Sequence, residues 1–280
     1  MWTKVLGLGL VVFLGVSFAV TPVYAGTHFK KVVVVVLENK NYDDSLKQPF
    51  MKKLADEGAL FQNFFAETHP SQPNYIAMVS GSTMGVTGDS NVNLNGRHLG
   101  DLLEAKGLGW KVYAEQYPGG CFLSARSGGY VRKHVPFLSF QNVQSNPARC
   151  GRIVDSSAFA EDIQSGTLPE VSLYIPDLNN DGHDTSAAYA DHWLQYTFEP
   201  LLKNPKFTQD TLLVVTFDES EMFSNNRIFT VFVGDSVVAG TVSSQSTNHY
   251  SLLRMIEDEF GLGSLGLNDA KSAPITGVWK

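Results

Sequence analysis

A run of five valines constrains the fold more than any other feature of this chain. The segment Lys31–Leu37 is apolar after its first residue, is mostly β-branched, and has no alternating polar positions. Such a run is typical of a strand buried on both faces of a parallel sheet. Glu38 and Asn39 follow it directly, so polar side chains stand where the strand ends.

Similar apolar runs alternate with helical segments along the rest of the chain. Segments 171–175 and 211–217 have the same buried-strand character, and 228–233 is a further candidate strand. Helical spacing of apolar residues occurs at 49–57, 74–80, 99–105, 187–202 and 249–260. This alternation predicts an α/β fold, a three-layer α/β/α sandwich around a largely parallel central sheet.

Residues 1–25 have the features of a signal peptide. Lys4 precedes an apolar stretch over 5–20, and Val23-Tyr24-Ala25 forms a small-x-small cleavage pattern. An uncleaved membrane anchor is the alternative, because the stretch approaches the length of a span. We expect cleavage and secretion, to the periplasm or the extracellular medium, of one domain over 26–280. Within that domain, 116–150 is a loop-rich excursion from the core.

Charge and cysteine content narrow the possible partners. The chain has 28 acidic and 21 basic residues, a net charge of −7, and no Lys/Arg run, which argues against a nucleic-acid partner. Beyond residue 25 no apolar stretch approaches the length of a membrane span. In an exported protein Cys121 and Cys150 are expected to form a disulfide; two separate buried thiols are the alternative.

Acidic clusters follow the predicted strands. Glu38-Asn39 ends the first run, Asp218-Glu219 ends the run at 211–217, and the segment 177–184 follows the run at 171–175 with four polar candidates: Asp177, Asp181, His183 and Asp184. Each cluster alone is compatible with ordinary turns and caps. Carboxyl ends of parallel strands meet at one edge, where converging carboxylates would repel each other unless a cation lay among them.

A further segment, Thr68-His69-Pro70-Ser71-Gln72-Pro73-Asn74, leads into a predicted helix. Its prolines place Ser71 at or just before the helix N-terminus, which favours an anion such as phosphate. A bound divalent metal would activate the serine hydroxyl as a nucleophile. The alternative is that Ser71 only caps the helix. Together with the carboxylate clusters, the segment favours a nucleophile.

These four motifs, in this order, resemble the phosphoesterase family that contains secreted acid phosphatases and bacterial phospholipases C, within the alkaline phosphatase superfamily. The resemblance spans residues 30 to 260 and implies an alkaline-phosphatase-like fold. It implies a covalent phosphoserine intermediate on Ser71 and a phosphate hydrogen bond from Asn74. The implied metal ligands beside the nucleophile are Glu38, Asn39, Asp218 and Glu219.

The resemblance also implies a second metal, held by Asp177, His183 and His249. Two departures weaken this expectation, because Glu219 stands where two-metal relatives carry histidine and the Asp177-to-His183 spacing is long. One metal, with the same segment and His249 positioning phosphate or transferring protons, fits equally well. The metal is Ca, Mg, Mn or Zn, which the residues do not distinguish. His69 either protonates the leaving group or packs against the proline turn.

The expected function is hydrolysis of phosphate monoesters by a metal-dependent enzyme of acid-phosphatase type. A phospholipase C-like phosphodiesterase is the alternative, and an exported protein that binds metal or phosphate without turnover is a third. The expected substrate is a small phosphate ester or a phosphoinositide head group. Arg126, Arg132 and Lys133 either meet a second substrate charge or form a solvated basic face.

Overall fold

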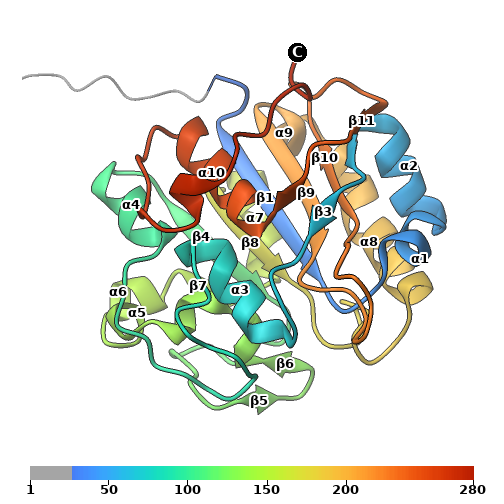
Figure 1. Ribbon diagram of the computed structural model, residues 1–280. Coiled ribbons are helices and arrows are strands. Elements are labelled where there is room, and N and C mark those ends of the chain that lie inside the picture. Colours follow the sequence, from blue (N-terminus) through green and yellow to red (C-terminus); the bar gives the residue numbers. More distant parts are fainter. Residues whose placement is uncertain (1–26) are drawn as a thin grey trace, which may run out of the picture.

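The computed structural model describes residues 27–280; the predicted signal peptide lies outside this range. A central sheet has eight strands in the order β11-β2-β10-β9-β1-β8-β4-β7 (Figure 1). Only β10 runs antiparallel to its neighbours among these strands. Their bounds, in chain order, are β1 Lys31–Leu37, β2 Ala59–Phe61, β4 Trp110–Ala114, β7 Ile153–Asp155, β8 Val171–Ile175, β9 Thr211–Phe217, β10 Thr230–Val233 and β11 Thr241–Ser243.

The valine run forms strand β1 in the middle of this sheet. It pairs in parallel with β8 on one side and β9 on the other, with Val32 opposite Val171 and Leu212. Residues 32–37 are at most 1% exposed, as expected for a strand covered on both faces. The predicted strands at 171–175 and 211–217 are therefore confirmed as the two neighbours of β1.

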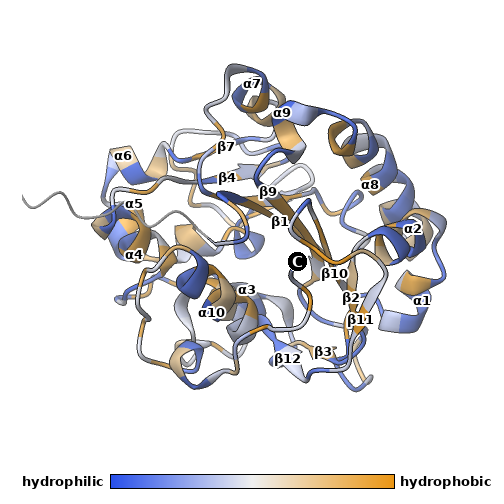
Figure 2. Ribbon diagram, turned by 90° about the horizontal axis from the view of Figure 1, so that it is seen from above, coloured by the Kyte–Doolittle hydropathy of each residue, from blue (hydrophilic) through white to orange (hydrophobic). Residues whose placement is uncertain are grey.

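Helices cover both faces of the sheet, which confirms the predicted three layers (Figure 2). One face carries α1 (Tyr42–Leu46), α2 (Pro49–Glu57), α7 (Ala158–Ser165), α8 (Ala187–Leu202) and α9 (Pro205–Thr208). The other carries α3 (Ser71–Ser80), α4 (Leu99–Ala105) and α10 (His249–Glu259). Helix α3 begins three residues before the predicted start, because Pro73 falls in its first turn, where a missing N–H is tolerated.

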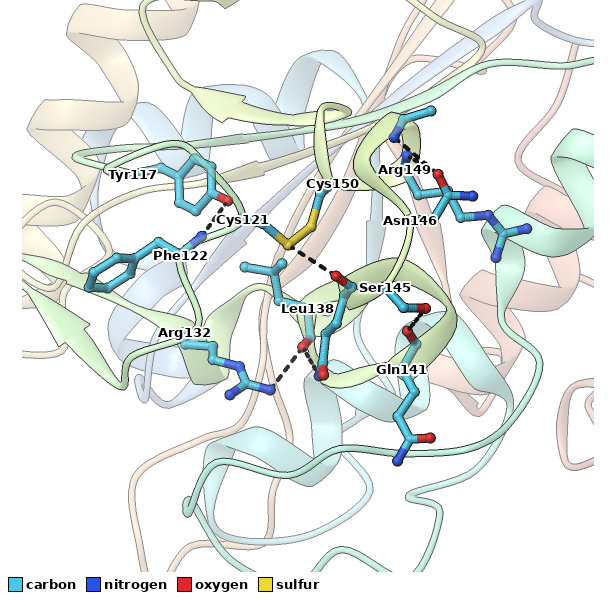
Figure 3. Close-up of a disulfide and its surroundings, with 12 residues drawn as sticks. Tyr117, Cys121, Phe122, Arg132, Leu138, Gln141, Ser145, Asn146, Arg149 and Cys150 are labelled. Atoms are coloured by element: carbon cyan, nitrogen blue, oxygen red, sulfur yellow. Dashed lines mark hydrogen bonds between the residues drawn. A yellow bond between two sulfur atoms is a disulfide. The ribbon is translucent and has the colours of Figure 1, made fainter.

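The loop-rich segment 116–150 folds over the carboxyl end of the sheet around a disulfide. Cys121 and Cys150 are joined, with Cα atoms 5.3 Å apart, as predicted (Figure 3). Arg132 is 4% exposed and donates to the carbonyls of Leu123 and Leu138, so it holds the segment together rather than forming a solvated face. The elements here are β5 Arg126–Ser127, β6 Tyr130–Val131, η1 Arg132–His134, η2 Pro136–Ser139, α5 Gln141–Gln144 and α6 Pro147–Cys150.

Short elements complete the domain. Strands β3 (Phe64–Phe65) and β12 (Thr247–Asn248) pair in parallel beside the main sheet, and η3 (Asp269–Lys271) follows α10. Within the described residues, no helix combines the length and apolar character that a membrane crossing requires.

A buried carboxyl in α10 gives a first prediction. Glu257 is 0% exposed beside Asp269, and burial raises its pKa to about 8. The folded chain therefore keeps a proton that the unfolded chain releases near pH 4.5, so stability falls as pH rises from there toward 8. We expect Glu257→Gln to stabilise the protein by about 1–3 kcal/mol at pH 8 and by much less at pH 5.

Thermal unfolding at the two pH values measures this difference. The matched control is Glu161→Gln, an exposed residue of α7. Equal stabilisation of the Glu257 variant at both pH values would show that the carboxyl is ionised in the folded chain.

Candidate active site

The carboxyl ends of β1 and β9 bring two predicted clusters together. The Asp218 N–H donates to the Leu37 carbonyl at 3.0 Å, which continues the strand pairing past the end of β9. Asn39 has a left-handed backbone, with φ of 53°, and its N–H donates to Asp218 Oδ1 at 3.3 Å. Glu38, Asp218 and Glu219 are at most 3% exposed. Adjacent parallel strands therefore place three carboxyl groups in one buried site.

Ser71 is the first residue of α3 and reaches into this site. Its Oγ lies 3.1 Å from Glu38 Oε2 and 3.1 Å from Glu219 Oε1, within donating distance of either carboxylate. Pro70 occupies the cap position, and no side chain caps the helix, so the alternative reading of Ser71 as an N-cap is wrong. The His69–Pro70 peptide bond is cis. The N-terminal end of α3 thus presents the Ser71 hydroxyl to the carboxylates, while the next N–H group, that of Gln72, donates to Asp89 Oδ1 at 3.0 Å.

The Asn39 side chain tests whether these residues fit a cation. One terminal atom of its amide lies 3.2 Å from Glu219 Oε1, 3.3 Å from Glu38 Oε2 and 3.2 Å from Asp218 Oδ1. As nitrogen, this atom donates to the carboxylates of the metal-free chain; as oxygen, it joins them as a ligand. Oxygen ligands from carboxylates and an amide match the preference of hard divalent cations. The four residues fit the metal that the resemblance implies.

Burial perturbs the acids of this site. Desolvation raises the pKa of Glu38 and of Glu219 to about 7, and it also raises that of Asp218. Repulsion from Glu38 adds to the rise at Asp218. Neutral pH therefore leaves protons in the metal-free site, and a divalent cation would have to displace them.

Three other predicted residues, His69, Asn74 and His249, form hydrogen bonds with residues of the site or of the segment that leads to Ser71. His69 Nδ1 is hydrogen-bonded to Glu219 Oε2, while its Nε2 is buried without a partner. Asn74 Oδ1 accepts from the N–H groups of Glu67 and Thr68 at 2.9 and 3.0 Å, so it holds the approach to Ser71. His249 Nε2 donates to the Asp218 carbonyl at 2.7 Å, and burial lowers its pKa to about 4.

The segment after β8 is divided between two places. Asp177 accepts from the N–H groups of Asn179 and Asn180 and from Gln116, as a turn residue does. His183 is exposed and pairs with Asp184 at 2.7 Å. Asp177, His183 and His249 do not form the second metal site, because among the described residues the group of His, Cys, Asp and Glu side chains close enough to share an ion contains none of the three.

A different group of possible metal ligands lies beside Glu38. One ligand atom each of Glu38, His134 and Asp181 lies within 4.8 Å of the others, and all three residues are buried. His134 was not among the predicted site residues. It stands in η1 of the 116–150 segment, outside every motif. The one signal in the sequence is that histidine is a possible metal ligand and that the chain has just seven of them.

Lys133, next to His134, brings a positive charge close to the carboxylates. It pairs with Asp89 Oδ2 at 2.7 Å, and Asp89 Oδ1 accepts from the N–H of Gln72, the residue after Ser71. Its charge acts to lower the pKa of Glu38 against the larger effect of burial. Arg126 is exposed and lies 4.0 Å from Asp184. Of the three predicted basic residues, only Lys133 is thus tied to the segment that carries Ser71.

Comparison with known proteins gives the family. The model of the Phosphoesterase family matches residues 44–263. The chain belongs to the phosphoesterase family. This confirms the resemblance seen in the four motifs.

Two relatives differ in how much of their length is covered. The chain is 36% identical over 254 residues to an acid phosphatase of Aspergillus fumigatus, covering 86% of this chain and 57% of that one. It therefore spans about three fifths of the length of the acid phosphatases it matches. It is 36% identical over 278 residues to a phosphatidylinositol-3-phosphatase of Mycobacterium tuberculosis, covering 97% of this chain and 88% of that one.

Solved structures support the fold. A protein of the alkaline phosphatase superfamily from Vibrio parahaemolyticus superposes with a TM-score of 0.62 at 12% identity, over 91% of this chain and 72% of that one. The alkaline-phosphatase-like architecture expected for this phosphoesterase is confirmed.

Proposed function

We propose that this phosphoesterase hydrolyses phosphate monoesters through a covalent phosphoserine on Ser71. One observation carries the proposal: the Ser71 hydroxyl lies 3.1 Å from a carboxylate oxygen of both Glu38 and Glu219, at the N-terminus of α3. This arrangement combines a nucleophile, acceptors for its proton and the positive end of a helix dipole, which favours an anion. The identity to acid phosphatases supports the same reaction class.

The residues divide the reaction between them. Ser71 Oγ forms a bond to phosphorus as the ester oxygen leaves, and water later cleaves the phosphoserine and restores the hydroxyl. His69 would pass a proton from Nε2, which has no partner, to the leaving oxygen, and its Nδ1 contact with Glu219 supports this role by orienting the ring. A divalent cation held by Glu38, Asn39, Asp218 and Glu219 would lower the pKa of the hydroxyl and withdraw charge from the phosphoryl oxygens. Lys133 adds a positive charge nearby.

The ligand set suits Mg²⁺, Mn²⁺ or Ca²⁺ better than Zn²⁺, because its donors are carboxylate and amide oxygens. Activity of chelator-treated protein after addition of each ion separately orders these metals. Zn²⁺ alone restoring full activity would contradict the proposed ligands.

Paired assays distinguish a monoesterase from the phospholipase C-like alternative. We expect the protein to release p-nitrophenol from p-nitrophenyl phosphate much faster than from bis-p-nitrophenyl phosphate. Activity confined to the diester would replace our proposal with the phosphodiesterase. Tight phosphate binding without release of product from either ester would identify a non-catalytic binding protein.

A phosphoinositide is our second candidate substrate, favoured by the relative of which this chain covers 88%. Near the site, Met222 and Phe223 follow Glu219 in a loop and are 56% and 99% exposed, so two apolar side chains are free to meet a lipid surface. We expect M222S/F223S to lower hydrolysis of phosphatidylinositol 3-phosphate in vesicles about tenfold or more, leaving p-nitrophenyl phosphate hydrolysis unchanged. Equal loss on both substrates would remove the loop from lipid recognition.

We also propose that the enzyme is exported after cleavage following Ala25. The disulfide supports an oxidising compartment. N-terminal sequencing of the protein recovered outside the cytoplasm should begin at Gly26; an intact Met1 would favour the membrane anchor.

A further inference from the structure

The carboxylate of Glu38 faces two different groups. Its Oε2 accepts from Ser71, on the side of the nucleophile. Its Oε1 has no hydrogen-bond partner and lies 3.1 Å from Nε2 of His134. On that second side, His134 Nδ1 lies 3.6 Å from Asp181 Oδ2. Glu38 thus stands between the site described above and a separate buried group.

That group is short of partners. Glu38 Oε1, Tyr75 Oη, His134 Nε2 and Asp181 Oδ2 are all buried without a hydrogen bond. None of the four residues is more than 1% exposed. Each buried unsatisfied polar group costs about 1–3 kcal/mol, and more if it is charged. The unpartnered atoms of Glu38, His134 and Asp181 belong to one compact group, in which His134 Nε2 faces Glu38 and Nδ1 faces Asp181, so one bound ion would satisfy carboxylates on both sides.

The chain builds this group from three rigid elements. The Glu38 N–H donates to the Asp181 carbonyl at 2.9 Å, which ties the segments after β1 and β8 together. The His134 ring stacks on Tyr75 of α3, with centroids 4.9 Å apart and planes 12° from parallel. Stacking therefore orients the His134 ring, while the His183 N–H holds Asp181 through Oδ1 at 2.7 Å and Ser71 holds Glu38 through Oε2, as in a preorganised ligand site.

We propose that Glu38, His134 and Asp181 bind a second divalent cation, with Glu38 bridging it to the metal beside Ser71. Their ligand atoms lie within 4.8 Å of one another, close to the span expected of ligands around one metal with bonds of about 2.0–2.3 Å. The contact of Glu38 Oε1 with His134 Nε2, at 3.1 Å, lacks hydrogen-bond geometry, so a cation bound by the two residues would satisfy both atoms. Two carboxylates and an imidazole suit Mn²⁺ or Zn²⁺.

This second ion has a positioning role. It lies on the Oε1 side of Glu38, away from Ser71, and holds Glu38 in the orientation in which Oε2 faces Ser71. The inference depends on the proposed function only through the metal at the shared Glu38. It differs from the second metal expected from the resemblance, which required Asp177, His183 and His249.

Mn²⁺ binding to the full-length mature protein tests the proposal. Titration calorimetry and emission spectroscopy count the ions, and electron paramagnetic resonance shows whether two Mn²⁺ ions are spin-coupled. We expect two ions per chain and a coupled spectrum for the wild type and for Ser71→Ala. His134→Gln and Asp181→Asn should each weaken one ion at least tenfold and give the spectrum of an isolated ion. His192→Gln and Asp235→Asn, both exposed, are the matched controls and should bind two.

Circular dichroism confirms that the variants fold, and the two independent substitutions guard against one that does not. A single ion in the wild type, unaffected by His134→Gln or Asp181→Asn, would overturn the second site. That outcome would leave the monoesterase proposal standing, because p-nitrophenyl phosphate turnover that depends on Ser71 and one metal needs only the first site.

Discussion

Replacing Ser71 by alanine should lower kcat for p-nitrophenyl phosphate by about a thousandfold or more, the scale seen when a covalent nucleophile is removed. The hydroxyl is the only group in the site that we assign to attack on phosphorus, and its two partners are carboxylates that cannot replace it. Circular dichroism and metal content should stay close to those of the wild type. Initial rates measured with saturating metal give the comparison.

Ser80→Ala is the matched control, since Ser80 is a buried serine at the other end of α3 whose hydroxyl bonds only to backbone carbonyls. We expect near-normal kcat for it. If both alanine variants turned over at the wild-type rate, Ser71 would have no part in the chemistry.

Asp218→Asn should have opposite effects on activity and on the stability of the metal-free protein. Loss of one ligand charge should weaken the metal beside Ser71 and reduce activity at least about a hundredfold. In the metal-free chain, burial and repulsion from Glu38 raise the pKa of Asp218, so the folded state keeps a proton that the unfolded state releases. The stability of the metal-free wild type therefore falls as pH rises above about 4. Asparagine does not ionise, so the stability of the Asp218→Asn variant should not show this fall.

Thermal unfolding at pH 5 and pH 7, with and without Mn²⁺, separates the two effects. We expect the variant to exceed the wild type in Tm at pH 7 without metal and to gain less from added Mn²⁺. The exposed Asp210→Asn, which breaks only an ion pair with Lys30, serves as the control. A metal-free variant less stable than the wild type at pH 7 would show that Asp218 is ionised and paired in the fold.

The parts of the fold that the sequence predicted are those where burial leaves a continuous pattern. Strands β1, β8 and β9 lie in the middle of the sheet, so their apolar runs are long and unbroken. Strand β4 was not predicted, because Lys111 interrupts its apolar run. In the structure the Lys111 side chain extends away from the sheet, and its Nζ pairs with Asp162 at 2.6 Å. The three-residue strands β2, β7 and β11 are too short to show a period.

The same distinction applies to the site. Glu38 and Asp218 could be placed from the sequence because they end paired central strands, so strand order alone brings them together. His134 could not, because its position depends on how the 116–150 segment packs and on stacking against Tyr75. Asp177 and His183 fit a motif, but the motif does not show how the chain turns after β8. In that turn the Asp177 carboxylate accepts from the Asn179 N–H, and His183 lies at the surface.

The stereochemical course at phosphorus is the most direct test of the covalent mechanism. A monoester whose phosphorus is made chiral with sulfur and oxygen isotopes would be hydrolysed in isotopically labelled water. Two in-line displacements, first by Ser71 and then by water, each invert phosphorus and together give net retention. Retention is the result that the phosphoserine mechanism requires, and inversion would show that water attacks the substrate directly and that Ser71 is never phosphorylated.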